Sequence, residues 1–222
     1  MRIRIALSAL ALLLAALGAA NAATISIADA RDLPLGTEVT VQGVVTAPSA
    51  AFVSSTFDRG FALQDATAGI QVNTGFGPGF DPGLNLLRRV RVTGTLDDDG
   101  FGLLVIRVAD ESDVVPLPGF FPVPATPVDT GDVGEATEGL LVEVEGTITR
   151  GPTNDLQFGY SVFIDDGSGE TQVFIPASTG INPFRLPYVE VGRRIRVRGF
   201  SGQFNAQYEV LPRLVTDILP AH

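Results

Sequence analysis

Two stretches of this sequence decide its fold: GTEVTVQGVVT, from Gly36 to Thr46, and GLLVEVEGTIT, from Gly139 to Thr149. They lie about 100 residues apart and follow one pattern. Further along, RRVRVTG, from Arg88 to Gly94, matches RRIRVRG, from Arg193 to Gly199, in the same order. The sequence therefore indicates a tandem duplication, and each copy is long enough to form a small domain.

Apolar and polar residues alternate within each copy. Val39 and Val41 in the first copy, like Val142 and Val144 in the second, are two residues apart, which is the period of a strand with one buried face. Glycine interrupts the first strand of each copy, as at Gly43, where a missing side chain permits the bend that a small barrel needs. We expect an all-β protein.

Each copy contains five predicted strands. They cover residues 38–47, 61–65, 69–73, 89–96 and 103–108 in the first copy, and 141–149, 161–165, 170–175, 194–200 and 207–211 in the second. A long connection follows the third strand, as in a five-stranded Greek-key barrel of the OB type. We predict two such barrels in tandem, because the alternative, a two-sheet sandwich, usually needs about seven or more strands. A short helix is expected to open each barrel, with Ser26 and Thr130 as N-caps.

The N-terminus has the order of a secretory signal. Arg2 and Arg4 precede an apolar stretch from Ile5 to Leu17, and small residues follow up to Ala22. A membrane anchor would need about 20 apolar residues, and this stretch is shorter. We expect residues 1–22 to be removed on export, which leaves a secreted or periplasmic chain without a membrane span.

The rest of the chain divides into two domains and a linker. We place the first domain at residues 23–118, the linker at 119–126 and the second domain at 127–222. Prolines at positions 116, 118, 122, 124 and 127 favour extended geometry, so we expect a semi-rigid spacer that leaves few contacts between the barrels. The chain has no cysteine, and each domain must therefore be stabilised by burial of its apolar residues.

Several segments resemble the OB-fold modules found beside the catalytic domains of bacterial extracellular nucleases and related secreted proteins. They are LGTEVTVQGVVTA, FALQDATAGIQV and RRVRVTGTL in the first copy, and VFIDDGSGETQVFI, VGRRIRVRG and YEVLPRLVTDI in the second. The resemblance covers nearly the whole mature chain and rests on structural glycines, turns and core positions. It implies nucleic-acid binding. No catalytic domain accompanies these modules in the sequence, so nuclease activity is not expected.

The sequence offers few groups for catalysis. Its single histidine is His222 and it has no cysteine, which excludes cysteine nucleophiles and zinc clusters. No serine or acid has an identifiable catalytic partner, so we expect a non-enzymatic protein without a cofactor. The acidic segments 97–100 and 165–170 have oxygen ligands of the kind that calcium prefers. Each falls between two predicted strands, where Asp and Gly favour turns, so we expect turns there and no metal site.

The chain has no lysine, and seven of the 13 arginines outside the predicted signal form two clusters at matching positions. Alternation along the fourth strands turns these arginines outward, where guanidinium groups can pair with phosphates. The predicted phosphate-binding residues are Arg89, Arg91, Arg194, Arg196 and Arg198. Alternatively, they pair with Glu143, Glu145 and neighbours on the adjoining first strand. The net charge of −10, which becomes −12 without Arg2 and Arg4, opposes nucleic-acid binding.

Aromatic residues indicate that the second barrel is better suited to a nucleic acid. Phe163 and Phe174 are predicted to point outward from its second and third strands, where bases stack in OB-type proteins, whereas the first copy has Ala62 and Asn73 there. Tyr160, Arg185 and Tyr188 are further candidates on flanking loops. Alternatively, the two phenylalanines pack on the other barrel or on Phe120 and Phe121.

Taken together, these patterns predict a secreted, non-enzymatic tandem OB-fold protein that binds single-stranded DNA or RNA, as an accessory to a separately encoded extracellular nuclease. The alternative is a protein or oligosaccharide interaction module of the cell envelope, which the same fold supports.

Overall fold

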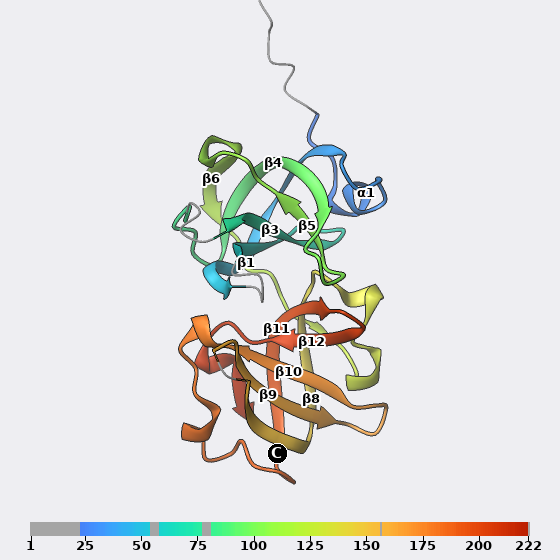
Figure 1. The fold of residues 1–222 in the computed structure, drawn as a ribbon, viewed down its shortest axis with the longest axis vertical. Coiled ribbons are helices and arrows are strands. Elements are labelled where there is room, and N and C mark those ends of the chain that lie inside the picture. The colour runs from blue at the N-terminus through green and yellow to red at the C-terminus, as the bar shows by residue number, and fades with distance from the viewer. Residues whose placement is uncertain (1–22, 54–57, 77–80, 156, 222) are drawn as a thin grey trace, which may run out of the picture.

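Two β-barrels lie one above the other along the long axis of the molecule (Figure 1). The computed structural model describes residues 23–53, 58–76, 81–155 and 157–221. The predicted export signal, residues 1–22, lies outside the described residues. Within the described ranges, no helix has the length and apolar character that a membrane crossing requires.

The first barrel is a closed ring of five strands. They are β1 (Glu38–Val53), β2 (Asp58–Gln64), β3 (Gly69–Phe76), β4 (Arg88–Asp98) and β5 (Leu104–Arg107). The strands are paired in the order β1-β2-β3-β5-β4, and β1 also pairs with β4, which closes the ring. β3 and β5 run parallel, and the other neighbours run antiparallel. This is the predicted Greek-key order of an OB fold.

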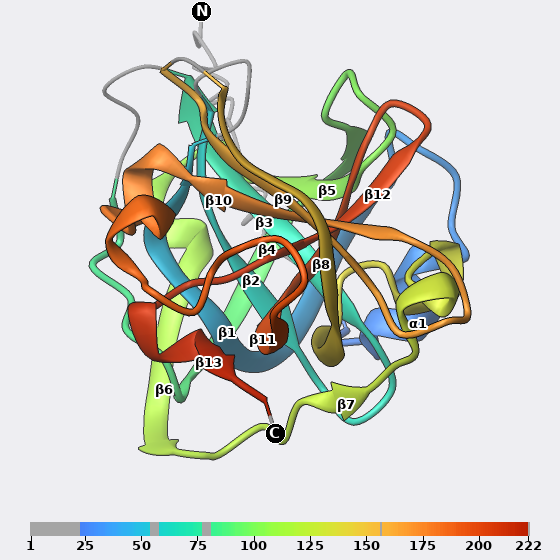
Figure 2. The ribbon, with the colours of Figure 1, turned by 90° about the horizontal axis from the view of Figure 1, so that it is seen from below.

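The second barrel repeats this arrangement. Its strands are β8 (Leu141–Asp155), β9 (Gly159–Asp165), β10 (Thr171–Pro176), β11 (Arg194–Phe204) and β12 (Gln207–Leu211). The parallel pair is β10 and β12, and β11 closes the ring against β8 (Figure 2). All ten predicted strands are present. β1 and β8 are longer than predicted, because after bulges they continue and pair again with β2 and β9.

The alternating apolar residues fill the interior of each barrel, as predicted. Val41 and Val92 lie in the core of the first barrel, and Val144 and Val197 lie in that of the second. A Cβ atom at Gly43 would lie 2.6 Å from the carbonyl oxygen of Gln64 on β2. Only glycine permits β1 to pass this close to its neighbour, which agrees with the predicted role of this residue.

The helical segments that open the barrels differ from each other. α1 (Ile27–Arg31) begins after the predicted N-cap Ser26, whose hydroxyl accepts a hydrogen bond from the Asp29 N–H at 3.0 Å. In the second barrel, two 3₁₀ turns, η2 (Thr130–Asp132) and η3 (Glu135–Thr137), replace a helix. The prediction for Thr130 is wrong: Asp129 takes the cap position, and the buried Thr130 hydroxyl donates instead to Asp166 at 2.8 Å.

Short elements complete the two sheets. β6 (Val114–Phe120) pairs with β4, β7 (Thr126–Pro127) pairs with β8, and β13 (Ile218–Pro220) pairs with β11. The remaining 3₁₀ turns are η1 (Glu111–Asp113), η4 (Ala177–Thr179), η5 (Pro183–Arg185) and η6 (Val215–Asp217). Much of the proline-rich segment is therefore paired into one sheet or the other, and only residues 121–125 lie between β6 and β7.

The barrels are packed against each other, so the expectation of few contacts between them is wrong. A separate apolar cluster joins them, in which Phe200 of β11 is 2% exposed. Its first-barrel members, Ala47, Ala51, Ala62, Leu103 and Val105, point outward from that barrel, and Leu211 packs against the cluster. The sequence pattern located the core faces of the strands, but it did not show that an outer face is also buried.

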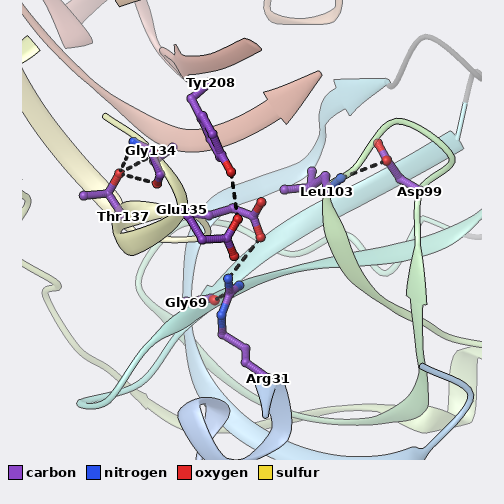
Figure 3. Close-up of polar contacts among 10 residues, drawn as sticks. Arg31, Gly69, Asp99, Leu103, Gly134, Glu135, Thr137 and Tyr208 are labelled. Atoms are coloured by element: carbon purple, nitrogen blue, oxygen red, sulfur yellow. Dashed lines mark hydrogen bonds and ion pairs between the residues drawn. The ribbon is translucent and has the colours of Figure 1, made fainter. Parts of the chain in front are cut away.

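A buried ion pair also crosses the interface (Figure 3). The guanidinium group of Arg31, on α1, lies 3.0 Å from the carboxylate of Glu138 and donates to the Gly69 carbonyl oxygen at 3.2 Å. The Glu138 side chain is 2% exposed. Its burial raises the pKa of Glu138 and Arg31 opposes this, so removal of the arginine would leave an unpaired buried acid.

Further hydrogen bonds join the barrels at other points. Arg213, buried and ion-paired with Asp217, donates to the Thr46 carbonyl oxygen of β1 at 2.6 Å. The Leu141 N–H donates to the Gln64 side chain at 2.9 Å. Because these bonds come from separate segments of both barrels, they hold the barrels in one relative orientation.

The backbones of the two barrels approach most closely at Gly69 and Gly139. A Cβ atom on Gly69 would lie 2.0 Å from the Gly139 carbonyl oxygen, and one on Gly139 would lie 2.2 Å from the Gly69 carbonyl oxygen. No side chain fits between these backbones. The interface therefore requires glycine at both positions.

We expect Gly69→Ala to lower the free energy of unfolding by about 1 to 3 kcal/mol, because the added methyl group must push the barrels apart. The matched control is Gly134→Ala. Gly134 has extended backbone, and the nearest atom to its added Cβ is 3.9 Å away. Urea denaturation of both variants measures the difference, and equal stabilities would contradict the tight backbone approach.

Candidate ligand-binding face

OB-type barrels bind oligonucleotides and oligosaccharides on the outer face of the second and third strands and on the loops between strands 1 and 2 and strands 4 and 5. In the second barrel this face consists of β9 and β10, the end of β8 and the β11–β12 turn. In the first barrel, Ala62 and Val105 of the corresponding face are buried in the cluster between the barrels. The second barrel is therefore the one whose face retains exposed side chains.

Phe163 and Phe174 lie on this face, as predicted. Their neighbours Val162, Ile164 and Val173 are in the barrel core, so alternation places both phenylalanines outside it, and each is partly exposed. Phe163 is opposite Gln172 in the β9–β10 register, and Phe174 is opposite Ser161. The two rings are thus diagonal neighbours on adjacent strands, close enough for one ligand to contact both.

Arg150, which the sequence analysis did not single out, covers the ring of Phe163. Its guanidinium carbon is 3.7 Å from the ring centroid. The same guanidinium group is ion-paired with Glu170, which lowers the pKa of that carboxyl group, and Glu170 also accepts from the Thr149 hydroxyl at 2.6 Å. Arg150 follows the bulge in β8, where regular alternation ends, so the sequence pattern could not assign its direction.

The predicted arginine row of the second barrel lies on another part of the surface. Arg194 donates to Glu145 at 2.8 Å, and Arg198 donates to Glu143 at 2.7 Å, across the β11–β8 pair. These ion pairs are the alternative considered from the sequence. Between them, Arg196 is exposed and has no carboxylate within 4.0 Å among the described residues. The glutamates of β8 thus separate the arginine row from Phe163 and Phe174.

The arginines of the first barrel also lie apart from this face. Arg89 lies 5.8 Å from the ring of Phe121, and Arg91 is exposed on β4. Arg88 lies similarly over Phe120, at 4.8 Å. The phenylalanines of the proline-rich segment therefore contact arginines of their own barrel.

The predicted flanking residues serve the core or lie away from the face. Tyr160 and Tyr188 pack against the core of the second barrel. The Tyr188 hydroxyl donates to the Ile218 carbonyl oxygen at 2.9 Å, and Tyr160 makes an edge contact with Phe184. Arg185 is exposed on η5. Of the predicted residues, the structure brings only Phe163 and Phe174 together on the candidate face.

The acidic segments form turns, as predicted. In the β4–β5 connection, Asp99 accepts hydrogen bonds from the N–H groups of Phe101 and Leu103 at 2.8 and 3.1 Å. In the β9–β10 turn, Asp165 accepts from the Gly167 N–H at 2.7 Å. No grouping of three metal-ligating side chains is found among the residues that the structure describes.

A cleft of about 360 Å³ lies beside the face, between the two barrels. Aromatic and other apolar side chains form its walls: Leu103, Phe158, Phe174, Pro176, Phe200, Phe204 and Leu211. Its polar lining consists of acids and amides: Gln71, Asp99, Asp155, Gln172, Gln203 and Glu209. Phe204 stacks on Phe101 of the first barrel at 4.8 Å, so both barrels contribute to the rim.

Glu209 is a buried acid in this cleft. It lies on β12, its residue is 8% exposed, and burial raises its pKa to about 8, with a further contribution from the Asp155 carboxylate. Burial likewise raises the pKa of Asp99. Val210 is a core residue, so alternation places its neighbour Glu209 outside the barrel. Glu209 is buried there in the cleft, whose lining includes residues of the first barrel, and the sequence carried no signal of that.

Comparisons with known proteins bear on the fold. A scan against protein-family models finds no match, and neither does a search of curated proteins. A search of solved structures finds matches of low identity. A murine DNA-binding protein bound to double-stranded DNA is 16% identical, with a TM-score of 0.38, and the match covers 82% of this chain and 96% of that one.

Two further structures are matched over most of this chain. Fission yeast Pot1 with single-stranded DNA is 10% identical, with a TM-score of 0.39, over 88% of this chain and 87% of that one. A Replication Protein A heterotrimer bound to single-stranded DNA is 10% identical, with a TM-score of 0.28, over 90% of this chain and 70% of that one. The link to bacterial nuclease modules stays a prediction.

The raised pKa of Glu209 predicts that the protein loses stability as the pH rises from about 5 to 8. In that range the folded protein keeps a proton on Glu209 that the unfolded chain, with a pKa near 4.5, releases. The slope from this group is at most about 1.4 kcal/mol per pH unit.

Urea denaturation between pH 5.5 and 8.5 tests this. Glu209→Gln should flatten the slope. Burial also raises the pKa values of Asp99 and Glu138, so any slope from these groups has the same sign. Glu190→Gln, at an exposed position, should leave the slope unchanged. An identical slope in Glu209→Gln and the unmodified chain would show that Glu209 does not titrate in this window.

Proposed function

We propose that this chain is an exported, non-enzymatic protein that binds single-stranded nucleic acid on the outer face of its second barrel. One observation carries the proposal: Phe174 lies beside the stack of Arg150 on Phe163, at the place where OB barrels bind oligonucleotides. Nucleobases stack on aromatic rings and on guanidinium planes, so these three side chains provide a platform for consecutive bases.

The surface charge determines whether phosphate contacts or base stacking would supply most of the affinity for a nucleic acid. Arg194 and Arg198 are already paired with glutamates, and the chain carries a net charge of −10. Of the predicted row Arg194, Arg196 and Arg198, only Arg196 has no ion pair among the described residues, and Arg150 is itself paired with Glu170. Base stacking would then supply most of the affinity, with a shallow dependence on salt, about −1 to −2 in the logarithmic slope.

Export and the absence of catalysis belong to the same proposal. The support for export is the N-terminal order of Arg2 and Arg4, an apolar stretch and small residues up to Ala22. The support for a binding role is that the sequence has no cysteine and only one histidine, at its last position. Such a protein would act as an accessory that holds a single strand for a separately encoded extracellular nuclease.

Fluorescence anisotropy with a labelled 20-nucleotide oligothymidine tests the proposal. At low salt, the intact chain should bind it, and Phe163→Ala and Phe174→Ala should each weaken binding by about 1 to 3 kcal/mol, the value of one stacked base, or about 5- to 150-fold. Phe120→Ala is the matched control, because Phe120 is 64% exposed but lies on β6 of the first barrel.

Equal losses in all three variants, or no binding with micromolar protein at low salt, would contradict the proposal. The same assay with labelled oligosaccharides would then test the alternative of a glycan-binding module, since acids, amides and aromatic rings adjoin the face.

A further inference from the structure

The cleft between the barrels has a chemistry different from that of the stacking platform. Three carboxyl groups line it, and they come from separate elements: Asp99 from the β4–β5 turn, Asp155 from the end of β8 and Glu209 from β12. No arginine is among the described residues that line it. The cleft therefore attracts cations and repels phosphates.

Glu209 is the group that points to a ligand. Its residue is 92% buried, as its exposure of 8% implies, and its side chain lines the cleft. Within the described part of the chain, its carboxyl group has no hydrogen bond and no ion pair. A buried acid without a partner is costly, and a cation that enters the cleft would provide one.

The walls of the cleft suit a ligand that has an apolar chain between two charged groups. Phe174 and Phe204 belong to its aromatic lining, and Leu103 and Leu211 add aliphatic surface. Aromatic rings attract ammonium groups through their π-faces and pack against methylene chains. A volume of about 360 Å³ is within the usual range for small-molecule sites.

We propose that the cleft between the two barrels binds a small organic cation, in which amine groups are joined by an apolar chain, as in a polyamine. One ammonium group pairs with Glu209, and a second pairs with the exposed Asp155. The methylene chain between them packs against the phenylalanines. An inorganic divalent ion would leave these apolar walls unused.

Pairing with the ammonium group changes the protonation of Glu209. Because burial raises the pKa of Glu209 to about 8, the acid is mostly protonated at pH 7 in the free protein, and it must release its proton to form the ion pair. Binding at pH 7 should therefore release close to one proton. An exposed acidic patch that attracts a polyamine non-specifically would release none.

Isothermal titration of the intact chain with spermidine at pH 7, in two buffers of different ionisation enthalpy, tests the site. We expect one spermidine per chain, with proton release, and no binding of 1,8-octanediol, an uncharged chain of similar length. Glu209→Gln should weaken binding at least tenfold and abolish the proton release. Asp155→Asn, at an exposed position, should weaken binding several-fold. Glu190→Gln, exposed and outside the cleft lining, should match the unmodified chain.

Three results would overturn the proposal. They are no heat of binding with spermidine, the same affinity for spermidine in Glu209→Gln and Glu190→Gln, and displacement of bound spermidine by magnesium at constant ionic strength. None of these results depends on the oligonucleotide assay. Failure of nucleic-acid binding would leave the amine site standing, and failure of amine binding would leave the stacking platform of Phe163 and Arg150 standing.

Discussion

The close contact between the backbones at Gly69 and Gly139 is the constraint on which the relation of the two barrels depends. At this point, one barrel touches the other with no side chain between them. At this separation, Arg31 pairs with Glu138, and Phe200 packs in the apolar cluster that joins the two barrels. The buried ion pair also fixes the relative orientation of the barrels, because a displacement of one barrel would leave a buried charge without its partner.

This packing gives the two copies of the repeat different roles. Ala62 of the first barrel and Phe163 of the second occupy equivalent places on the faces where OB barrels bind ligands. The small side chain of Ala62 lets the first barrel use this face for docking, and it is buried. The larger Phe163 remains at the surface under Arg150. Duplication therefore supplied one face that is buried between the barrels and another that stays at the surface.

The interface also separates charges. Arginines and glutamates of β11 and β8 neutralise each other on one side of the second barrel, whereas acids collect in the cleft on the other side. Glu209 is buried among the residues that line this cleft, and its burial raises the pKa of its carboxyl group. The face of Phe163 and Phe174 adjoins this acidic cleft, because Phe174 lies on the face and also lines the cleft.

By itself, the sequence determined the duplication, the strands, the residues of both cores, the acidic turns and the outward direction of Phe163 and Phe174. These features follow from local rules, namely the period of two in a strand and the preference of Asp and Gly for turns.

Tertiary structure alone decided which outward residues are exposed. Ala62, Phe200 and Glu209 all point away from their cores, yet each is buried, because a surface on a distant part of the chain covers it. Alternation turned Arg194 and Arg198 outward and offered Glu143 and Glu145 as partners, and the register of β11 against β8 decided that these ion pairs form. Alternation reports only the side of the strand on which a residue lies, and contacts between separate segments depend on how those segments meet in space.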